Sequence, residues 1–290
     1  MTQVAKRDKK IAMMTTAVVC VVCVIVAFII VLNAVIIPNG KYRDAIALLD
    51  AGNIVEAYEA LVALNGYKDS AAKADAAFDK YKAEKLKAAA VGDRVFFGTY
   101  EQDNDAFNGK EDIAWLVLAK ENNKILVISD KALGSQLYNT SKVNVTWENC
   151  SLRAWLNGAF LHAAFSSAEQ AMIADTNVLP DKNPEYSTEP GNATMDKVFL
   201  LGINEVNQYF GSDEARRCAS TAYAKANGAW TGSNYTKDGA TTCWWWLRSP
   251  GYLQDMAVGV DGDGFVYFIG NPVDFATGCI RPALWINLDS

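Results

Sequence analysis

The chain has 290 residues, of which 51% are apolar and 21% charged, a composition typical of globular proteins and sufficient for one or two domains. The first ten residues carry four basic side chains (Lys6, Arg7, Lys9 and Lys10) and one acidic side chain, Asp8. The rest of the chain holds 23 of the 27 basic and 32 of the 33 acidic residues, so its net charge is −9. Because phosphate binding needs a concentrated basic surface, we expect no nucleic-acid partner.

An apolar run follows, and it contains no charged residue from Ile11 to Gly40. A run of this length exceeds the apolar region of a signal peptide and suffices to cross a bilayer as a helix. We therefore expect one N-terminal transmembrane helix over residues 11–38. The basic cluster precedes it, so the positive-inside rule predicts a cytoplasmic tail over residues 1–10, a single-pass cell-membrane location and an extracellular C-terminal domain.

Residues 41–90 show helical periodicity, with turn-forming pairs at Gly52-Asn53 and Gly66-Tyr67. The stretch LLDAGNIVEAYEALVALNGYKDSAAKADAAFDKY resembles a tetratricopeptide repeat and covers about one repeat. One repeat buries little surface by itself, so we expect a short helical hairpin stalk that acts as a spacer rather than a peptide-binding domain.

Residues 91–290 alternate apolar residues with aromatics, Gly and Asn. Asn122-Asn123, Asp261-Gly262 and Asp263-Gly264 supply hairpin turns. Strands and helices that are segregated along the chain predict an α+β domain. We expect strands over 93–99, 113–119, 124–129, 243–247, 256–260, 265–268 and 280–286, and short helices over 151–157, 167–173 and 204–210.

Several segments of this domain, in this order, resemble a bacterial surface domain-of-unknown-function family. They are GDRVFFGTYEQDN, VTWENCSLRAWLNGAFL, KVFLLGINEVNQYF and a C-terminal signature, CWWWLRSPG…RPALWI. The family is similar to the C-type-lectin-like fold, which is shared with formylglycine-generating (sulfatase-modifying) enzymes. The resemblance implies that the strands WWWLRSP and IRPALWI pair near the centre of the domain. It implies a fold and not a ligand.

The last hairpins carry the candidate ligand-binding residues. Between Ala257 and Leu284 there is no Met, Trp, Gln, Lys or Glu, the residues that codons ending in a pyrimidine cannot encode. Lectin-like domains, and some members of the resembled family, are targets of diversity-generating retroelements, so the bias indicates either a diversified surface or the ordinary composition of Gly-rich hairpins. Exposed loops on a rigid scaffold are the expected place of binding in both cases. The candidates are Tyr252, Leu253, Asp255, Phe265, Tyr267, Phe268, Asn271, Asp274 and Phe275.

The Trp-rich strand offers an alternative recognition surface, because indole faces stack on sugars. Successive strand residues point to opposite faces, however, so we expect most of Trp244, Trp245 and Trp246 to pack in the core. Arg248 and Arg281 are expected to be buried and paired with a carboxylate or with carbonyl groups, because an unpaired buried charge is costly.

The spacing of the acidic residues and of the cysteines gives little support to metal binding or thiol chemistry. Asp255, Asp261 and Asp263 offer oxygen ligands to calcium, but Phe265 stands where an EF-hand would place its third ligand, so a tight turn is the simpler interpretation. We expect no cofactor other than this calcium alternative. Cys20 and Cys23 form a C-x-x-C inside the apolar run, where we interpret them as small hydrophobic residues. No pair among Cys150, Cys218, Cys243 and Cys279 has zinc-ligand spacing, and both free thiols and disulfides stay open for these four.

Catalysis is not expected. His162 is the only histidine and no motif ties it to a nucleophile. The sequence predicts a membrane-anchored, receptor- or adhesin-like protein that recognises an extracellular protein, glycan or cell-wall ligand through its C-terminal loops. The alternative is an extracytoplasmic modifying enzyme similar to formylglycine-generating enzymes, which the resemblance connects with copper-binding cysteines. That alternative requires Cys243 and Cys279 to meet in an open cleft, and the sequence TGCIRP does not match the enzyme pattern.

Overall fold

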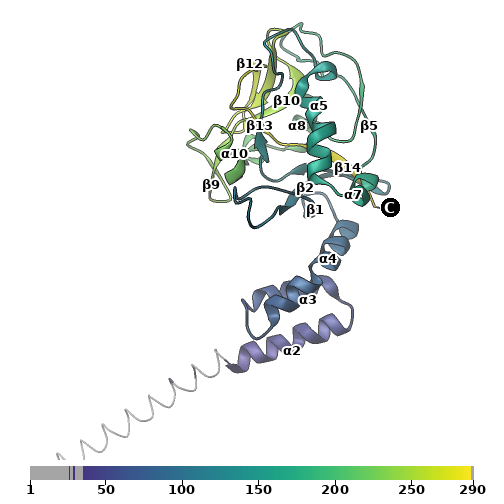
Figure 1. Cartoon of the computed structure of the whole chain (residues 1–290), viewed down its shortest axis with the longest axis vertical. Helices are drawn as coiled ribbons and strands as arrows, with labels where there is room; N and C mark the ends of the chain where they lie inside the picture. Colours follow the sequence, from purple (N-terminus) through teal and green to yellow (C-terminus); the bar gives the residue numbers. More distant parts are fainter. Residues whose placement is uncertain (1–25, 27–28, 30–34, 289–290) are drawn as a thin grey trace, which may run out of the picture. The chain divides into compact units, whose positions relative to one another are not determined.

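The computed structural model describes residues 26, 29 and 35–288, which form a mixed α/β structure with several sheets (Figure 1). The chain divides into two compact units, one that ends at Lys85 and one that begins at Leu86. Helices alone make up the described part of the first unit, and the second unit contains all the described strands.

The structure does not support the predicted transmembrane helix over residues 11–38. In the part of the chain that is described, no helix combines the length and the apolar character needed to cross a membrane. Most of residues 11–38 lie outside the described residues, and the end of the run enters helix α2 (Ile37–Asp50), which carries Lys41, Arg43 and Asp44. The same finding overturns the single-pass membrane location predicted with a cytoplasmic N-terminus and an extracellular C-terminal domain.

Three helices make up the described N-terminal unit, as the periodicity after residue 41 predicts. Helix α2 is followed by α3 (Ile54–Ala63) and α4 (Ser70–Ala88). Their small core contains Ala45, Leu61 and Ala74, and Tyr58 of α3 stacks on Tyr81 of α4 with ring centroids 4.1 Å apart. With so few buried side chains, this unit gains little stability from hydrophobic burial.

The first sheet of the C-terminal unit is antiparallel and has the order β1-β2-β3-β14. The hairpin between β2 and β3 turns at Asn122, whose φ of 51° suits a turn residue. The strands are β1 (Arg94–Tyr100), β2 (Glu111–Glu121), β3 (Lys124–Ser129) and β14 (Ala283–Asn287).

The second sheet has the order β12-β11-β10-β13-β4. Its pairs are antiparallel except for β10 and β13, which run parallel with Trp245 opposite Cys279. The strands are β4 (Gly134–Ser135), β10 (Trp245–Pro250), β11 (Met256–Val260), β12 (Val266–Pro272) and β13 (Cys279–Ile280).

The pairing that the resemblance implies between WWWLRSP and IRPALWI is not confirmed, because the residue opposite Trp245 is Cys279, which precedes IRPALWI. Strand β10 lies in the middle of the second sheet and pairs with β13, which ends just before Arg281. The remainder of the IRPALWI segment forms β14 and joins the first sheet beside β3. The last strands therefore connect the two sheets.

Short elements complete the C-terminal unit. Helix α5 continues through a π-helical turn, η3, into α6, so the helix expected over 151–157 is longer than predicted. The remaining elements are β5 (Thr176–Val178), β6 (Thr194–Asp196), β7 (Cys218–Ala219), β8 (Thr236–Lys237), β9 (Ala240–Cys243), η2 (Trp147–Asn149), α5 (Ser151–Trp155), η3 (Leu156–Phe160), α6 (Leu161–Ala164), α7 (Ser167–Met172), α8 (Ile203–Tyr209), α9 (Asp213–Arg216) and α10 (Ala222–Ala226).

The core confirms two predictions about buried residues. Trp244, Trp245 and Trp246 are all buried, with exposed fractions of 6%, 0% and 0%. Arg248 is buried and bonds to Glu205 and to the carbonyl oxygens of residues 179 and 200. Arg281 is also buried, donates to the carbonyl of residue 129 at 2.9 Å and lies over the ring of Trp245 at 5.0 Å.

Candidate functional site

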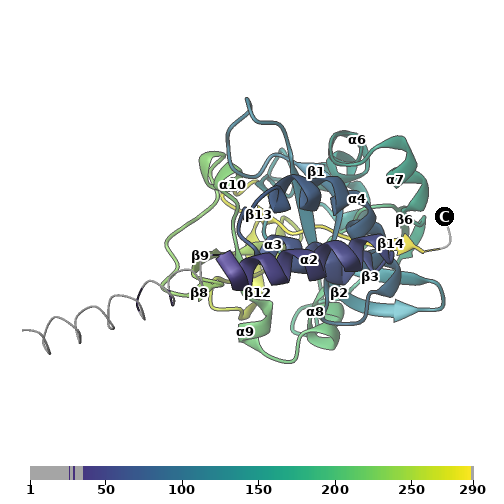
Figure 2. The same cartoon turned by 90° about the horizontal axis from the view of Figure 1, so that it is seen from below.

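A surface groove of about 530 Å³ in the C-terminal unit is the candidate site, and we call it the aromatic groove. It is formed by the loop before β8, the residue between β9 and β10, the turn between β11 and β12, the end of β12 and the segment that follows it. Figure 2 shows β8, β9 and β12 at the same end of this unit. The lining residues are Trp230, Gly232, Ser233, Asn234, Tyr235, Trp244, Asp261, Gly262, Asp263, Asn271, Phe275 and Thr277.

Two aromatic walls of the groove are held by Thr277. Its backbone carbonyl accepts a hydrogen bond from the backbone N–H of Trp230 at 3.4 Å. Its hydroxyl accepts one from the indole N–H of Trp244 at 3.3 Å. The rings of Trp244 and Phe275 lie 6.1 Å apart. Trp230 and Phe275 stay nearly half exposed while Trp244 is buried, so the groove has an aromatic floor and two accessible aromatic sides.

Thr242, at the end of β9, ties the separate pieces of the groove together. Its hydroxyl lies 2.6 Å from the hydroxyl of Ser233, 2.6 Å from the carbonyl oxygen of Gly262 and 3.1 Å from that of Tyr235. A Cβ atom on Gly262 would lie 2.7 Å from the Ser233 hydroxyl, so glycine is required for this close approach of loop and turn. The polar side of the groove is thus fixed by interactions beneath it.

The turn between β11 and β12 forms where the sequence predicts it. The N–H of Gly264 donates to the carbonyl of Asp261 at 2.8 Å, and the N–H of Phe265 donates to the carboxylate of Asp263 at 2.9 Å. Gly264 has a φ of +94°, and a Cβ atom there would meet the backbone of Asp213. This turn places Asp261 and Asp263 in the wall of the groove.

The groove is acidic. Burial, and in second place the charge of Asp263, raise the pKa of Asp261. The nearby guanidinium of Arg217 lies over the ring of Tyr235 at 4.6 Å, and its Nε donates to the backbone carbonyl of Asp263 rather than to a carboxylate. Its ion-pair partner is Glu214, at 3.7 Å.

The structure distributes the nine predicted binding residues over several places, and only Asn271 and Phe275 line the aromatic groove. Phe265, Leu253 and Asp274 are exposed outside it. Asp255 is half-buried and lies 3.9 Å from Lys142. Tyr267 and Phe268 are also half-buried, and Phe268 packs against the core.

Tyr252 contributes to a second hollow, of about 500 Å³. Its ring meets that of Tyr186 edge to face at 5.0 Å. The other lining residues are polar or acidic, including Glu185, Glu189 and Gln254. The hollow has fewer aromatic walls than the aromatic groove, so we regard it as the weaker candidate for small-ligand binding.

Sequence reasoning missed the loop that supplies Trp230, Ser233, Asn234 and Tyr235 to the groove. The segment AWTGSNY has a visible signal, since aromatic residues among Gly, Ser and Asn are the composition of antibody binding loops. Periodicity does not detect such a loop, because it forms no regular element.

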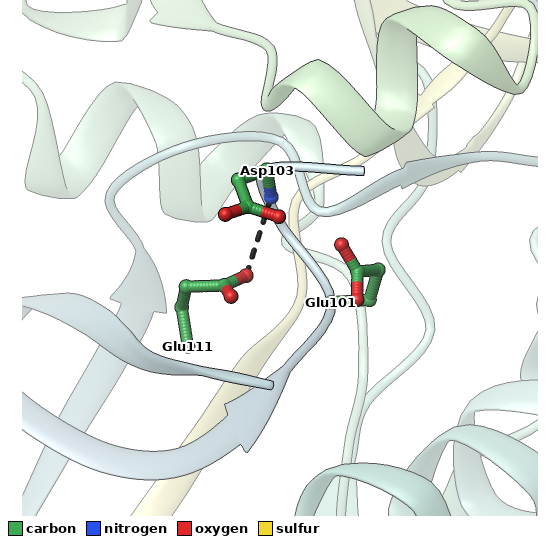
Figure 3. Close-up of side chains that lie close together, drawn as sticks. All are labelled: Glu101, Asp103 and Glu111. Atoms are coloured by element: carbon green, nitrogen blue, oxygen red, sulfur yellow. Dashed lines mark hydrogen bonds between the residues drawn. The ribbon is translucent and has the colours of Figure 1, made fainter. Parts of the chain in front are cut away.

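The fold does not bring together the three aspartates that the calcium alternative requires. Among the described residues, Asp255, Asp261 and Asp263 do not form a group close enough to share one ion. The described residues that do approach one another are Glu101, Asp103 and Glu111, whose ligand atoms lie within 4.8 Å of one another (Figure 3).

These three carboxylates shape their own loop. The N–H of Asp103 donates to Glu111 at 3.2 Å (Figure 3), and the N–H of Asp105 donates to Glu101 at 3.1 Å. The side-chain amide of Asn108 donates a hydrogen bond to the carboxylate of Asp103 at 2.7 Å. Carboxylates that cap backbone N–H groups in this way are common in turns, so the cluster has a sufficient structural explanation.

The cysteines of the described chain, Cys150, Cys218, Cys243 and Cys279, are free and buried. Cys218 and Cys243 face each other across β7 and β9. Burial raises the pKa of Cys150 to about 12 and that of Cys218 well above its usual value. A hydrogen bond from Cys218 lowers the pKa of Cys243, but hydrogen bonding to Cys279 and burial together raise it well above the usual value. Cys243 and Cys279 therefore do not lie in the open cleft that a copper-dependent enzyme would need.

Comparison with known proteins supplies the family. No curated protein and no solved structure matches the chain. A family described as "Domain of unknown function (DUF6273)" matches residues 122–288, more than half of the chain and all of the aromatic groove. The match confirms the expectation of a domain-of-unknown-function family, but not the C-terminal signature or the resemblance to lectins and sulfatase-modifying enzymes. The chain belongs to the DUF6273 family.

Proposed function

We propose that this protein binds a ligand in the aromatic groove and that this binding is its function. The observation that carries the proposal is one groove of about 530 Å³ with four aromatic residues, two carboxylates and two amide side chains in its lining. Ligand sites are commonly concave and mostly apolar, with a few polar groups that fix orientation.

The construction of the groove supports recognition. Its walls are loops and turns, and the strands β9, β10, β11 and β12 beneath them are fixed by backbone pairing. Loops held by a rigid scaffold are where binding residues concentrate. Tyr and Trp side chains provide large contact areas at a small cost in conformational entropy.

The ligand class in this proposal is a protein, a glycan or cell-wall material. A C-type-lectin-like fold is also part of the proposal, and the position of the Trp-rich strand β10 in the middle of the second sheet supports it. The groove lies directly beside this strand, since Trp244 precedes β10 and lines the groove.

A non-enzymatic role is proposed as well. The alternative, an enzyme similar to formylglycine-generating enzymes, depends on reactive thiols at Cys243 and Cys279, and both side chains are fully buried. A thiol must ionise to bind copper or to attack a substrate, and the raised pKa of Cys243 opposes ionisation. Burial and protonation therefore favour binding over thiol chemistry.

Titration of the full chain with soluble oligosaccharides, cell-wall fragments and short peptides tests the proposal. The readout is the pair of indole N–H signals of Trp230 and Trp244 in NMR spectra. For any probe that shifts them, we expect Phe275→Ala to weaken binding about tenfold, because one aromatic contact in the groove is lost.

Phe265→Ala is the matched control, because Phe265 is an exposed phenylalanine of the neighbouring turn and does not line the groove. It should leave the affinity unchanged. Equal weakening by both substitutions, or probes that bind without shifting either indole signal, would place recognition elsewhere and contradict the proposal.

A further inference from the structure

The charges of the aromatic groove are not balanced within it. Among the described residues, no basic side chain forms an ion pair with the carboxylate of Asp261 or Asp263, although both line the groove. Within the part of the chain that the structure describes, no group donates a hydrogen bond to the Asp261 carboxylate. The Asp263 carboxylate accepts one, from the backbone N–H of Phe265. Two acceptor groups are thus left for a ligand.

The basic residues nearest to this turn are already committed. Arg216 pairs with Asp213, and Arg217 pairs with Glu214. Both arginines also donate to backbone carbonyl oxygens of the turn, at 2.9 and 3.0 Å. These six charged residues therefore leave an excess of two negative charges, which corresponds to Asp261 and Asp263. An anionic ligand would be repelled, and a cationic one attracted.

The walls favour an organic cation over a metal ion. Calcium takes six to eight oxygen ligands, whereas Trp230, Trp244 and Phe275 present rings. The face of an aromatic ring attracts ammonium and guanidinium groups. The protein already shows this interaction at the rim of the groove, where Arg217 lies over Tyr235.

The hydroxyl groups of the lining favour a side chain over a sugar. The hydroxyl of Ser233 bonds to Thr242, and that of Thr277 bonds to Trp244. Among the described residues, the polar side-chain groups of the lining that stay open to a ligand are the carboxylates of Asp261 and Asp263, the amides of Asn234 and Asn271 and the hydroxyl of Tyr235, and only the two carboxylates are charged. A lysine or arginine side chain needs little more than an apolar surface for its stem and a carboxylate for its charged end.

We propose that the aromatic groove binds a lysine or arginine side chain presented by a partner protein. The aliphatic stem lies against Trp230 and Phe275, and the cationic end reaches Asp261 and Asp263. This inference rests on the proposed function, because it names the ligand of the same groove.

Matched peptides that differ in charge provide the test. The full chain is titrated with acetylated, amidated Gly-Lys-Gly and with the same peptide carrying acetyl-lysine. Gly-Arg-Gly and its citrulline counterpart form a second pair. We expect each cationic peptide to shift the indole signals of Trp230 and Trp244 and to bind at least about tenfold more tightly than its neutral counterpart.

Two substitutions with the same chemical change locate the charge. Asp261→Asn should weaken binding of the cationic peptides about tenfold and leave the neutral peptides unaffected. Asp274→Asn is the control, because Asp274 is an exposed carboxylate of the same region that does not line the groove. Asp274→Asn should change neither the affinity for the cationic peptides nor that for the neutral peptides.

Three results would overturn the inference. Equal affinity for the charged and neutral peptides would remove the cation requirement. Tighter binding of glucosamine than of N-acetylglucosamine, without any response to the peptides, would identify an amino sugar and not a protein side chain. If no cationic probe at about 10 mM shifts either indole signal, the inference fails; neutral oligosaccharides that still shift the signals would leave the proposed function standing.

Discussion

Asp261 combines two opposing effects at the scale of a single residue. Its carboxylate lies in a partly buried wall and close to a second carboxylate, so ionisation is unfavourable in the folded protein and its pKa is raised. A ligand cation would relieve the same repulsion. An ionised Asp261 carboxylate can bind a cation, but in the free protein the same ionised group lowers stability.

A pH-dependent stability difference follows for Asp261→Asn. A carboxyl group with a raised pKa in the folded state contributes stability at low pH, and this contribution is lost as the pH rises through the raised value. At pH 7 the ionised Asp261 is therefore unfavourable, and the amide, which cannot ionise, should make the protein more stable. Chemical denaturation at pH 7 and at about pH 3.5, below the ordinary aspartate pKa, should show the advantage only at pH 7.

The comparison for this prediction is Asp274→Asn, which should leave the free energy of unfolding the same at both pH values, because the side chain is exposed. If Asp261→Asn is destabilising at pH 7, the carboxylate has a favourable partner and the explanation of its raised pKa by burial and repulsion is wrong.

At the scale of elements, strand β10 and helix α8 are joined through buried charge. The guanidinium of Arg248 bonds to Glu205 and to the carbonyl of residue 200 at 3.0 Å, and the backbone N–H of Arg248 donates to the carbonyl of Leu201 at 3.0 Å. The segment before α8 thus bonds to β10 through both side chain and backbone.

Removal of this charge should cost considerable stability. Arg248→Met leaves Glu205 and the carbonyl groups of Leu179 and Leu200 without their partner, and we expect a loss of about 3 kcal/mol in the free energy of unfolding. This is the low end of the range for a buried pair, because the Glu205 side chain is 27% exposed. The measurement is urea denaturation at neutral pH.

The exposed pair of Lys142 and Asp255 gives the reference for that measurement. Its partners are 3.9 Å apart and the lysine is 55% exposed, so Lys142→Met should change stability by less than about 1 kcal/mol. Similar effects of the two substitutions would mean that Arg248 is not held by its buried partners.

Elements with a strong local pattern were predictable from sequence. The strands over 124–129 and 256–260 have the predicted bounds, because apolar residues there follow the strand pattern and turn residues flank them. The strand expected over 243–247 is instead the end of β9 and the start of β10, in two different sheets. The change of sheet at Trp244 depends on tertiary partners, so local sequence does not reveal it.

The groove was predictable only in part, for a related reason. Phe275 and Asn271 follow from the expectation that the last hairpins bind, and Asp261 and Asp263 were identified as turn residues. The loop at Trp230 joins them through Thr242, whose hydrogen bonds connect residues that are far apart in sequence. Two-residue strands such as β7 and β8 carry no periodicity, so the sheet that holds this loop had no signal either.

At the scale of the whole molecule, the boundary between the two units differs from the one that composition suggests. The sequence changes character at Val91, but the C-terminal unit begins at Leu86. Leu86 and Ala89 are buried in its core, with exposed fractions of 7% and 1%. The end of helix α4 therefore belongs energetically to the unit that follows it.

Two truncated chains test this boundary. We expect residues 86–290 to unfold cooperatively on their own, and residues 91–290 to be less stable by about 2 kcal/mol, the contribution of burying one leucine. Thermal and urea unfolding followed by tryptophan fluorescence measure the difference. Equal stability of the two fragments would show that Leu86 contributes nothing to this core.

The crossing of the last strands between the two sheets has a consequence for how the protein is made. Strand β13 fills the place between β10 and β4, and β14 covers β3, yet both follow all the other described strands in sequence. Until these two strands have been synthesised, β10 and β3 each have an open edge, and such edges invite association with other chains. Closing the two sheets also requires β13 and β14 to pair with β4 and β3, segments more than 100 residues away in sequence, and such long-range pairing is intrinsically slow.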